Sequence, residues 1–294
     1  MIKASEIAKY LSCSLVGEDI EVYRPCSINK VLSNSVVFLN RSIVNETYDN
    51  LNSKNDVICI VSSEFSYHLK CTYIEHENPR LAFSKILQEF FVKNDCPAIS
   101  NQASIDSSAN IGEGVTICPG VRIGANAVIG NHSIIGQNCV IEKNSIIGDY
   151  CRIKPNTTIG AKGFGFVVDE NQYPNEFPHI GNVKVGEHVE IGANCTVVQA
   201  TLDRTVIEDY VKIDDHVHVA HNCHIGKRTQ IAAGVILSGS VTIGESVWIS
   251  PNATIIDYAK IGDKAFIGIG SVVTRNVKNN ERVFGIPATP IKKK

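Results

Sequence analysis

The fold is decided by residues 105–158, which read IDSSAN IGEGVT ICPGVR IGANAV IGNHSI IGQNCV IEKNSI IGDYCR IKPNTT when written in steps of six. Every step begins with isoleucine, and the residue four places later is small or β-branched throughout. The aliphatic phase resumes at Val185 and again at Ile207, from which it continues to Val273. A period of six residues is typical of β-helices.

Three hexads make one triangular coil, in which each hexad supplies a short strand and a turn. The aliphatic residues are expected to stack inside this prism, because stacking buries a continuous core that no single repeat could bury alone. Glycine often follows the aliphatic residue, as at Gly112 and Gly124, and is expected to serve turns with a positive φ. Four cysteines at the small inward position are expected to be core residues: Cys139, Cys151, Cys195 and Cys223.

The hexad pattern covers only part of the chain. Residues 1–99 lack it and read as a small α/β domain, with strands predicted at 35–40 and 56–63 and an amphipathic helix at 78–93. The fold class is therefore predicted as mainly β, a parallel β-helix with a small N-terminal α/β domain. The later segments expected are the β-helix over 100–275 and a short C-terminal tail over 276–294.

Two interruptions of the repeat are expected to loop out of the prism, at 160–184 and 198–206. Loops that protrude from a rigid scaffold often carry function. The first loop contains Phe164 and Phe166, which favours a substrate-binding role over a merely solvated excursion.

Composition excludes several classes of protein. The net charge of −2 gives no broad basic field for nucleic acid. The sequence has no run of about 18 apolar residues for a membrane span and no apolar leader, so a bacterial cytoplasmic location is expected. The ten cysteines are then expected to be reduced. The sequence contains no CxxC pair, which argues against a zinc site, and no metal is predicted.

The segment DDHVHVAHNCHIG, residues 214–226, contains four histidines: His216, His218, His221 and His224. Their places in the hexads put them on different faces and turns, which disfavours a metal site within one chain, although a trimer axis would gather copies of one of them. His221 is the candidate base, because Gly239 lies one coil of three hexads later and is expected to stack beside it with a backbone N–H for an oxyanion. Asp203, one coil earlier, is expected to orient the imidazole. The alternative for His221 is an exposed turn histidine.

Several motifs together resemble the UDP-3-O-(3-hydroxyacyl)glucosamine N-acyltransferases of lipid A synthesis: IGAKGFGF, VEIGANCTV, LDRT, HVAHN, GVILSGS and GIPATP. The resemblance covers nearly the whole chain. It implies left-handed winding, a homotrimer with active sites between neighbouring prisms, and a uridine-binding N-terminal domain. It also implies that His221 is the general base, that Gly239 is the oxyanion donor, that Phe38 and Asn40 contact the nucleotide, and that Asn222 touches the sugar.

The chain departs from that family near the expected substrate sites. Val198–Ala200 stands where the family has Asp-Arg-Gly, and Tyr258 stands near the place of a second active-site histidine. Ile43 falls near the aromatic residue that helps Phe38 to sandwich uracil, and the family's C-terminal helical extension is absent. These departures indicate a relative with another substrate, in which Tyr258 is a candidate substrate-binding residue.

The C-terminal half also resembles sugar acetyltransferases of the same superfamily, through GESVWISPNATI and GIGSVVTRNV. That resemblance implies a coenzyme A groove near Trp248, Gly268 and Gly270, although Trp248 could equally cover an edge of the solenoid. No permanently bound cofactor is expected, and the acyl donor is a co-substrate, acetyl-coenzyme A or an acyl carrier protein.

Three functions remain open. The first is transfer of acetyl from acetyl-coenzyme A to the amino group of a nucleotide-linked amino sugar, for surface polysaccharide synthesis. The second is the lipid A reaction itself, with a 3-hydroxyacyl carrier protein. The third is a non-catalytic trimeric β-helix that binds a partner.

Overall fold

The computed structural model describes residues 1–40, 45–92 and 99–290. The chain divides into two compact units, Met1–Asp95 and Cys96–Lys294. Ile43 lies outside the described residues. No helix within the described ranges is long and apolar enough to cross a membrane.

The N-terminal unit is a five-stranded sheet with helices, ordered β2-β7-β6-β5-β4. The strands of the unit are β1 Ile2–Lys3, β2 Leu15–Val16, β3 Glu21–Val22, β4 Arg24–Pro25, β5 Ser35–Leu39, β6 Val57–Val61 and β7 Thr72–Glu75. The helices are α1 Ala4–Tyr10, α2 Asn45–Asn52, α3 Ser63–Ser66, α4 Pro79–Ile86 and the π-helical turn η1 Leu87–Phe91. Every residue of β6 is buried, because this central parallel strand is covered on both sides.

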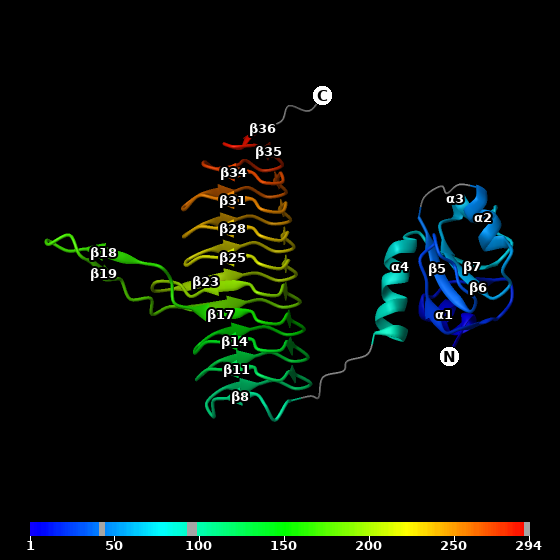
Figure 1. The fold of residues 1–294 in the computed structure, drawn as a ribbon, viewed down its shortest axis with the longest axis horizontal. Helices are drawn as coiled ribbons and strands as arrows, with labels where there is room; N and C mark the ends of the chain where they lie inside the picture. Colours follow the sequence, from blue (N-terminus) through cyan, green and yellow to red (C-terminus); the bar gives the residue numbers. More distant parts are fainter. Residues whose placement is uncertain (41–44, 93–98, 291–294) are drawn as a thin grey trace. The chain divides into compact units, whose positions relative to one another are not determined.

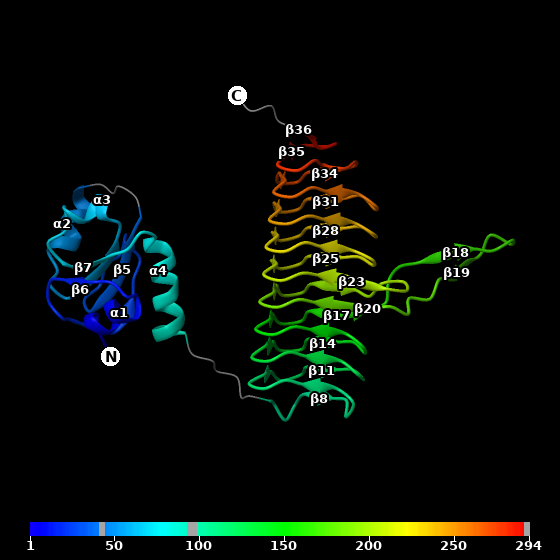
Figure 2. The ribbon, with the colours of Figure 1, turned by 180° about the vertical axis from the view of Figure 1, so that it is seen from behind.

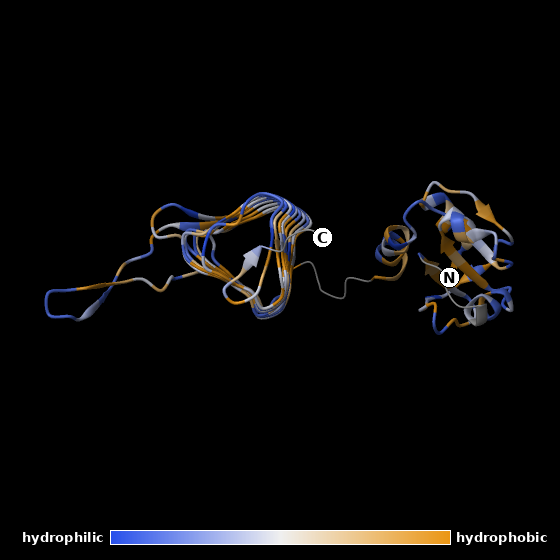
Figure 3. Cartoon of the chain, turned by 90° about the horizontal axis from the view of Figure 1, so that it is seen from above, coloured by the Kyte–Doolittle hydropathy of each residue, from blue (hydrophilic) through white to orange (hydrophobic). Residues whose placement is uncertain are grey.

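The C-terminal unit is a left-handed parallel β-helix with three faces. Seen from above, its coils superimpose as a triangle (Figure 3). The chain passes from the first face to the second, then to the third, and back to the first one coil higher. We call the turns between the first and second faces the first corner, those between the second and third the second corner, and those between the third and first the third corner.

Each face is a ladder of very short strands. The first face contains β8 Ser104–Ile105, β11 Arg122–Ile123, β14 Val140–Ile141, β17 Thr158–Ala161, β22 Thr196–Val198, β25 His218–Val219, β28 Ile236–Leu237, β31 Thr254–Ile255 and β34 Val272–Val273. The second face contains β9 Asn110–Ile111, β12 Val128–Ile129, β15 Ile146–Ile147, β20 Asn182–Val185, β23 Arg204–Ile207, β26 His224–Ile225, β29 Thr242–Ile243 and β32 Lys260–Ile261. The third face contains β10 Thr116–Ile117, β13 Ile134–Ile135, β16 Arg152–Ile153, β21 Glu190–Ile191, β24 Lys212–Ile213, β27 Gln230–Ile231, β30 Trp248–Ile249, β33 Phe266–Ile267, β35 Arg282–Phe284 and β36 Thr289–Pro290.

The core of the prism is the column of hexad aliphatics that the sequence predicts. Ile117 to Val273 form one continuous buried cluster, with the small inward residues packed between the aliphatics. Partners in neighbouring coils are three hexads apart wherever no insertion intervenes, as for Ile231 and Ile249. The four predicted core cysteines are all buried. Cys118 is disulfide-bonded, which corrects the expectation that all ten cysteines are reduced. That expectation rests on the inferred compartment, which does not determine which cysteines folding brings within bonding distance.

A substitution of Ile231 measures the strength of this core. Its side chain is only 2% exposed, and truncation would leave a cavity that the rigid neighbouring coils cannot fill. We expect Ile231→Ala to lower the free energy of unfolding by about 2–5 kcal/mol, and Ile231→Val by about 0.5–1.5 kcal/mol. Chemical denaturation followed by circular dichroism tests both values. Equal losses for the two variants would contradict a close-packed core.

The glycines that follow the aliphatics serve a different purpose from the one expected. The positive φ angles fall three residues after the aliphatic residue, mostly on non-glycine residues: Asn126, His132, Asn138, Asn144, Tyr150 and Asn156, with Gly114 and Gly120 at the same position of the repeat. A Cβ on Gly112 would lie 2.7 Å from Asn131 Oδ1, and one on Gly124 would lie 2.6 Å from the Lys143 backbone nitrogen. Glycine is therefore required there because the next coil passes too close for a side chain.

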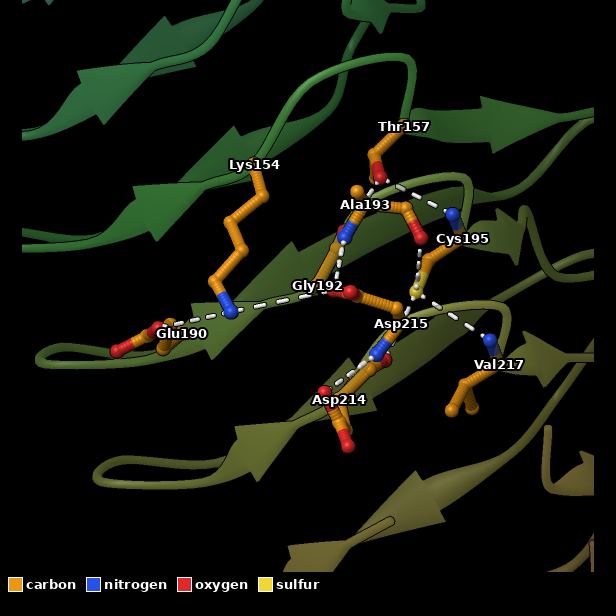
Figure 4. A network of polar contacts seen from close by, with 9 residues as sticks. All are labelled: Lys154, Thr157, Glu190, Gly192, Ala193, Cys195, Asp214, Asp215 and Val217. Carbon is orange, nitrogen blue, oxygen red and sulfur yellow. Dashed lines mark hydrogen bonds and ion pairs between the residues drawn. The ribbon is translucent and has the colours of Figure 1, made fainter. Parts of the chain in front are cut away.

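Polar residues inside the corners connect one coil to the next, as the third corner shows (Figure 4). Thr157 Oγ1 donates to the Gly192 carbonyl at 2.6 Å and accepts from the Cys195 N–H at 3.1 Å. The Cys195 thiol accepts from the Val217 N–H at 3.3 Å and donates to the Asp214 carbonyl at 3.1 Å. The small inward residues thus satisfy buried backbone groups as well as filling space.

The first corner carries both insertions. The segment between β17 and β20 protrudes from the prism and ends in an antiparallel hairpin, β18 Phe166–Val168 and β19 Pro174–Glu176 (Figures 1 and 2). The shorter segment, 199–203, joins β22 to β23. Both lie within the loop ranges expected from the broken repeat.

The expected tail over 276–294 contains further elements of the prism. Val277 bridges to Ile261, and β35 pairs in parallel with β33. β36 then pairs antiparallel with β35. Val283 and Ala288 are buried in the prism core. The end of a solenoid exposes an apolar coil that needs a cap, and these residues provide it even though their spacing no longer follows the hexad.

Candidate active site

The first corner brings His221 and Gly239 together. His221 lies between β25 and β26, and Gly239 lies one coil higher between β28 and β29, with the Ser240 N–H bonded to the His221 carbonyl at 2.9 Å. A Cβ placed on Gly239 would lie 2.6 Å from Cε1 and 2.8 Å from Nε2 of the His221 ring. The spacing of three hexads therefore predicts this contact correctly, and the imidazole lies against the glycine because no side chain intervenes.

A pocket of about 330 Å³ opens beside these two residues. Its walls come from both neighbouring coils and from the first insertion, and it is lined by Lys162, Phe164, Thr196, Val198, His218, Ala220, His221 and Gly239. Burial lowers the pKa of His218 below its ordinary value. Of the aromatic pair expected in this loop, Phe164 lines the pocket, and Phe166 packs against it with ring centroids 5.0 Å apart.

Asn222 connects His221 to the second insertion. Its Oδ1 accepts from the Thr201 N–H at 2.9 Å, and its Nδ2 donates to Thr201 Oγ1 at 3.1 Å. The same Nδ2 lies 3.2 Å from Nδ1 of His221, and the Asn222 N–H donates to Thr205 Oγ1 at 3.0 Å. All polar groups of the Asn222 side chain are thus engaged in holding the corner, so its expected sugar contact would require some of these bonds to be exchanged.

His179 is a residue of this site that the sequence pattern does not reveal. It lies in the first insertion, just before β20, and its side chain is 7% exposed. Its ring meets that of His221 edge to face, with centroids 5.1 Å apart and an angle of 65°. Burial, with a smaller contribution from His179, lowers the pKa of His221 below the usual 6.5.

Asp203 does not take the orienting position expected for it. On the second face Ile225 pairs with Ile207, which lies three hexads earlier in the sequence. On the first face Val219 pairs with Val197, which lies three hexads and four further residues earlier. Four extra residues therefore lie in the corner beneath His221, and Thr201 takes the place next to Asn222. Asp203 is exposed and lines a separate pocket of about 680 Å³ with Asn182 and Arg204.

Tyr258 lies at the first corner one coil above Gly239, and its N–H donates to the Gly239 carbonyl at 3.0 Å. Its side chain is 72% exposed and does not line the pocket beside His221. The phenol is therefore on the correct corner for a substrate contact but points into solvent within one chain.

Trp248, Gly268 and Gly270 are separated from His221. Trp248 belongs to β30 on the third face and lines a groove of about 270 Å³ with Lys154, Glu190, Lys212 and Gln230. Gly268 and Gly270 lie at the third corner, where Gly268 packs against Phe284 and Gly270 has no atom within 4 Å of an added Cβ. A single protomer therefore does not bring these three residues to the candidate base.

Phe38 and Asn40 lie in the N-terminal unit, in β5 and directly after it. The Phe38 ring is partly exposed and contacts Phe83 of α4, with centroids 4.9 Å apart. Asn40 is exposed. The two residues are two positions apart at the carboxyl end of a parallel strand, which is the edge where α/β sheets bind ligands.

The four histidines of residues 214–226 do not converge. His224 is on the second face and lies 2.9 Å from Glu208, whereas His216 occupies the third corner. Among the residues that the structure describes, no group of three or more His, Cys, Asp or Glu side chains could hold a metal ion.

Three stretches of the chain match the family model "Bacterial transferase hexapeptide (six repeats)", residues 126–161, 204–239 and 240–275. A UDP-3-O-acylglucosamine N-acyltransferase of Lawsonia intracellularis is 37% identical over 230 residues, which cover 71% of this chain and 65% of that protein. The protein of the same name from Campylobacter lari is 34% identical over 231 residues, 72% of this chain and 69% of that protein. The match thus spans about two thirds of each relative's length.

Solved structures share the fold. A UDP-N-acetylglucosamine acyltransferase from Bacteroides fragilis superimposes with a TM-score of 0.54 at 27% identity, covering 66% of this chain and 73% of that one. The corresponding protein from Campylobacter jejuni gives a TM-score of 0.58 at 22% identity, with the same coverage of this chain and 73% of that one.

Proposed function

Because the chain belongs to the UDP-3-O-acylglucosamine N-acyltransferase family of hexapeptide-repeat proteins, we propose that it transfers an acyl group from a thioester to the amino group of a UDP-linked amino sugar. The observation that carries this proposal is the contact between His221 and Gly239 at the edge of a pocket. Acyl transfer to an amine needs a base for the amine proton and a donor for the oxyanion, and this contact supplies both groups.

In this reaction the sugar amine attacks the thioester carbonyl, and His221 accepts the proton that the amine loses. The carbonyl oxygen gains negative charge, and the Gly239 N–H stabilises it, since this N–H donates to no acceptor among the described residues. Collapse of the intermediate releases the thiolate, to which the protonated imidazole returns the proton. The lowered pKa of His221 favours its neutral form, which is the form that can act as a base.

The tautomer of His221 sets a condition on this step. An amide nitrogen can only donate, so with Asn222 Nδ2 beside Nδ1 the neutral ring carries its proton on Nε2. Nε2 can accept the amine proton only when Nδ1 carries the ring proton. A proton on Nδ1 therefore requires the contact between Nδ1 and Asn222 Nδ2 to open.

The N-terminal unit is proposed to bind the nucleotide. Phe38 offers a partly exposed ring for the base, supported from behind by Phe83, and Asn40 offers an amide for its polar edge. We further propose a cytoplasmic homotrimer, in which a neighbouring prism completes the groove around His221.

The donor distinguishes two forms of the proposal. The relatives' names favour UDP-3-O-acylglucosamine as the acceptor, for which the family resemblance implies a 3-hydroxyacyl carrier protein as the donor. The sequence alone favours acetyl transfer from acetyl-coenzyme A to another nucleotide-linked amino sugar. The second candidate is supported by the pocket, which measures about 330 Å³ in one chain and is walled by Val198 where the family pattern begins with Asp. No permanently bound cofactor is needed for either form.

A panel of donors and acceptors tests the function. UDP-3-O-acylglucosamine and other UDP- and dTDP-linked amino sugars are each incubated with 3-hydroxyacyl carrier protein or acetyl-coenzyme A, and amide formation is measured by mass spectrometry. We expect turnover of UDP-3-O-acylglucosamine with the carrier protein. Turnover with acetyl-coenzyme A alone would establish the second candidate, and no amide from any pair would favour the non-catalytic binding protein.

A further inference from the structure

His179 occupies an unusual environment for a histidine in a surface insertion. Its Nδ1 lies 3.0 Å from the Phe177 carbonyl, which can only accept, so Nδ1 donates and, in the neutral ring, Nε2 carries the lone pair. Nε2 is buried and has no hydrogen-bond partner in the described part of the chain. A buried lone pair without a donor is destabilising, so the placement needs an explanation.

The surrounding backbone is shaped to accept this ring. A Cβ on Gly163 would lie 2.4 Å from His179 Nε2, and one on Gly165 would lie 2.7 Å from Cε1. The two glycines flank Phe164, which lines the pocket, so the ring of His179 lies directly behind the pocket wall. Its position is thus fixed on one side by the insertion and on the other by the imidazole of His221.

His179 also joins the two insertions. Its carbonyl accepts from Gln199 Nε2 at 2.6 Å, and the Ile180 N–H donates to the Thr201 carbonyl at 2.9 Å. Thr201 in turn is held by Asn222, next to His221. Gln199 is one of the residues that replace Asp-Arg-Gly, so the departure from the family pattern lies at this junction.

We propose that His179 is a positioning residue for the acyl-transfer reaction, which fixes the His221 ring against Gly239 and locks the two insertions around it. The proposal rests on the proposed function. In this chain the insertion before β20 supplies a second histidine to the site. The coil above Gly239, where the family resemblance implies a second histidine, has the solvent-exposed Tyr258.

Charge supports the same assignment. The His179 ring, whose centroid is 5.1 Å from that of His221, adds to burial in lowering the pKa of His221. The other titratable groups at the pocket are His218 and Lys162, and Lys162 is paired with Glu176 at 3.7 Å. His179 therefore helps to keep His221 neutral, in addition to holding its orientation.

The test compares His179→Gln with His216→Asn. Glutamine keeps a polar side chain but removes the second ring, whereas His216 is exposed at another corner and asparagine suits its positive φ. The pKa of His221 is measured by NMR titration of the free protein, and kcat/KM is measured against pH with the active donor. We expect His179→Gln to raise the pKa of His221 by about half a unit to one unit, to shift the acid limb of kcat/KM equally, and to lower kcat about 10-fold. His216→Asn is expected to change none of these.

The NMR titration separates this proposal from the function, because it needs no substrate. An unchanged His221 pKa and an unchanged acid limb in His179→Gln would overturn it, even if the enzyme is active. If the variant does not fold, Gln199→Ala replaces it. That change removes the 2.6 Å bond to the His179 carbonyl and is expected to shift the pKa in the same direction by a smaller amount. No shift in that variant would overturn the proposal equally.

Discussion

Replacing His221 by alanine is expected to lower kcat of acyl transfer by about 10²- to 10⁴-fold, the usual contribution of a general base. The side chain lies at a corner, and its ring contacts Asn222 Nδ2, which keeps its bond to Thr201 Oγ1 when the ring is removed. The His221 backbone carbonyl accepts from the Ser240 N–H whatever the side chain. The thermal transition should therefore change little. Single-turnover kinetics at saturating donor and acceptor measure the chemical step directly.

His224→Ala provides the matched control for His221→Ala. It removes a nearby histidine that is bonded to Glu208 on the second face and does not line the pocket. We expect its kcat to stay within about two-fold of the unmodified protein, as is usual for surface substitutions. If His221→Ala retained near-normal kcat at saturation, another group would have to be the base.

The pH profile provides a second signature of the same residue. A base works only when unprotonated, and the pKa of His221 is lowered by burial and by His179. The rate that depends on His221 should therefore hold down to a pH below 6.5 and fall only as the pH drops through the lowered pKa. Above this pKa the rate should not change further through the titration of His221.

The prism could be predicted from the sequence because its physical cause is periodic. One aliphatic residue in six faces a closed core, so the pattern and the buried column are the same set of residues. The same periodicity locates His221 against Gly239, since no residue is inserted between them. It also separates Trp248 from His218, because the two are five hexads apart and a coil contains three, and the structure places them on different faces.

The rest of the candidate site lies where periodicity fails. The expectation for Asp203 comes from counting three hexads back from His221. The corner beneath His221 contains four extra residues, so this count no longer identifies the stacked neighbour, and Asp203 lies away from the imidazole. His179 belongs to a long insertion that folds back onto its own corner, and no spacing in the sequence indicates that return. The motif PHIG at the end of the insertion, just before the hexads resume, is the one available signal.

The glycines show a further limit of sequence reasoning. A glycine can be required by backbone conformation or by a close neighbour, and the sequence does not distinguish these causes. In this prism most positive φ angles fall on residues such as asparagine, histidine and tyrosine, and some on glycines such as Gly114 and Gly120, while the glycine directly after the aliphatic residue stands where the next coil approaches. Gly239 belongs to the second kind, except that its close neighbour is the imidazole of His221 instead of backbone.

That contact makes Gly239→Ala the second substitution with a large expected effect. The added methyl would lie 2.6 Å from Cε1 and 2.8 Å from Nε2 of His221, closer than carbon and nitrogen atoms can approach, so the ring must move. A displacement of about 1 Å at a catalytic group can cost about 100-fold in rate. We therefore expect kcat to fall about 100-fold while the prism stays folded, as measured by single-turnover kinetics and a thermal melt.

The His221→Ala background identifies the cause of that loss. If the methyl acts by displacing the imidazole, adding Gly239→Ala to His221→Ala should leave kcat within about two-fold of the single His221→Ala variant, because the ring that would be displaced is gone. Independent losses that multiply would instead show that alanine damages the oxyanion donor itself. Full activity of Gly239→Ala alone would mean that His221 can work from a different rotamer, and the contact between the two residues would no longer define the site.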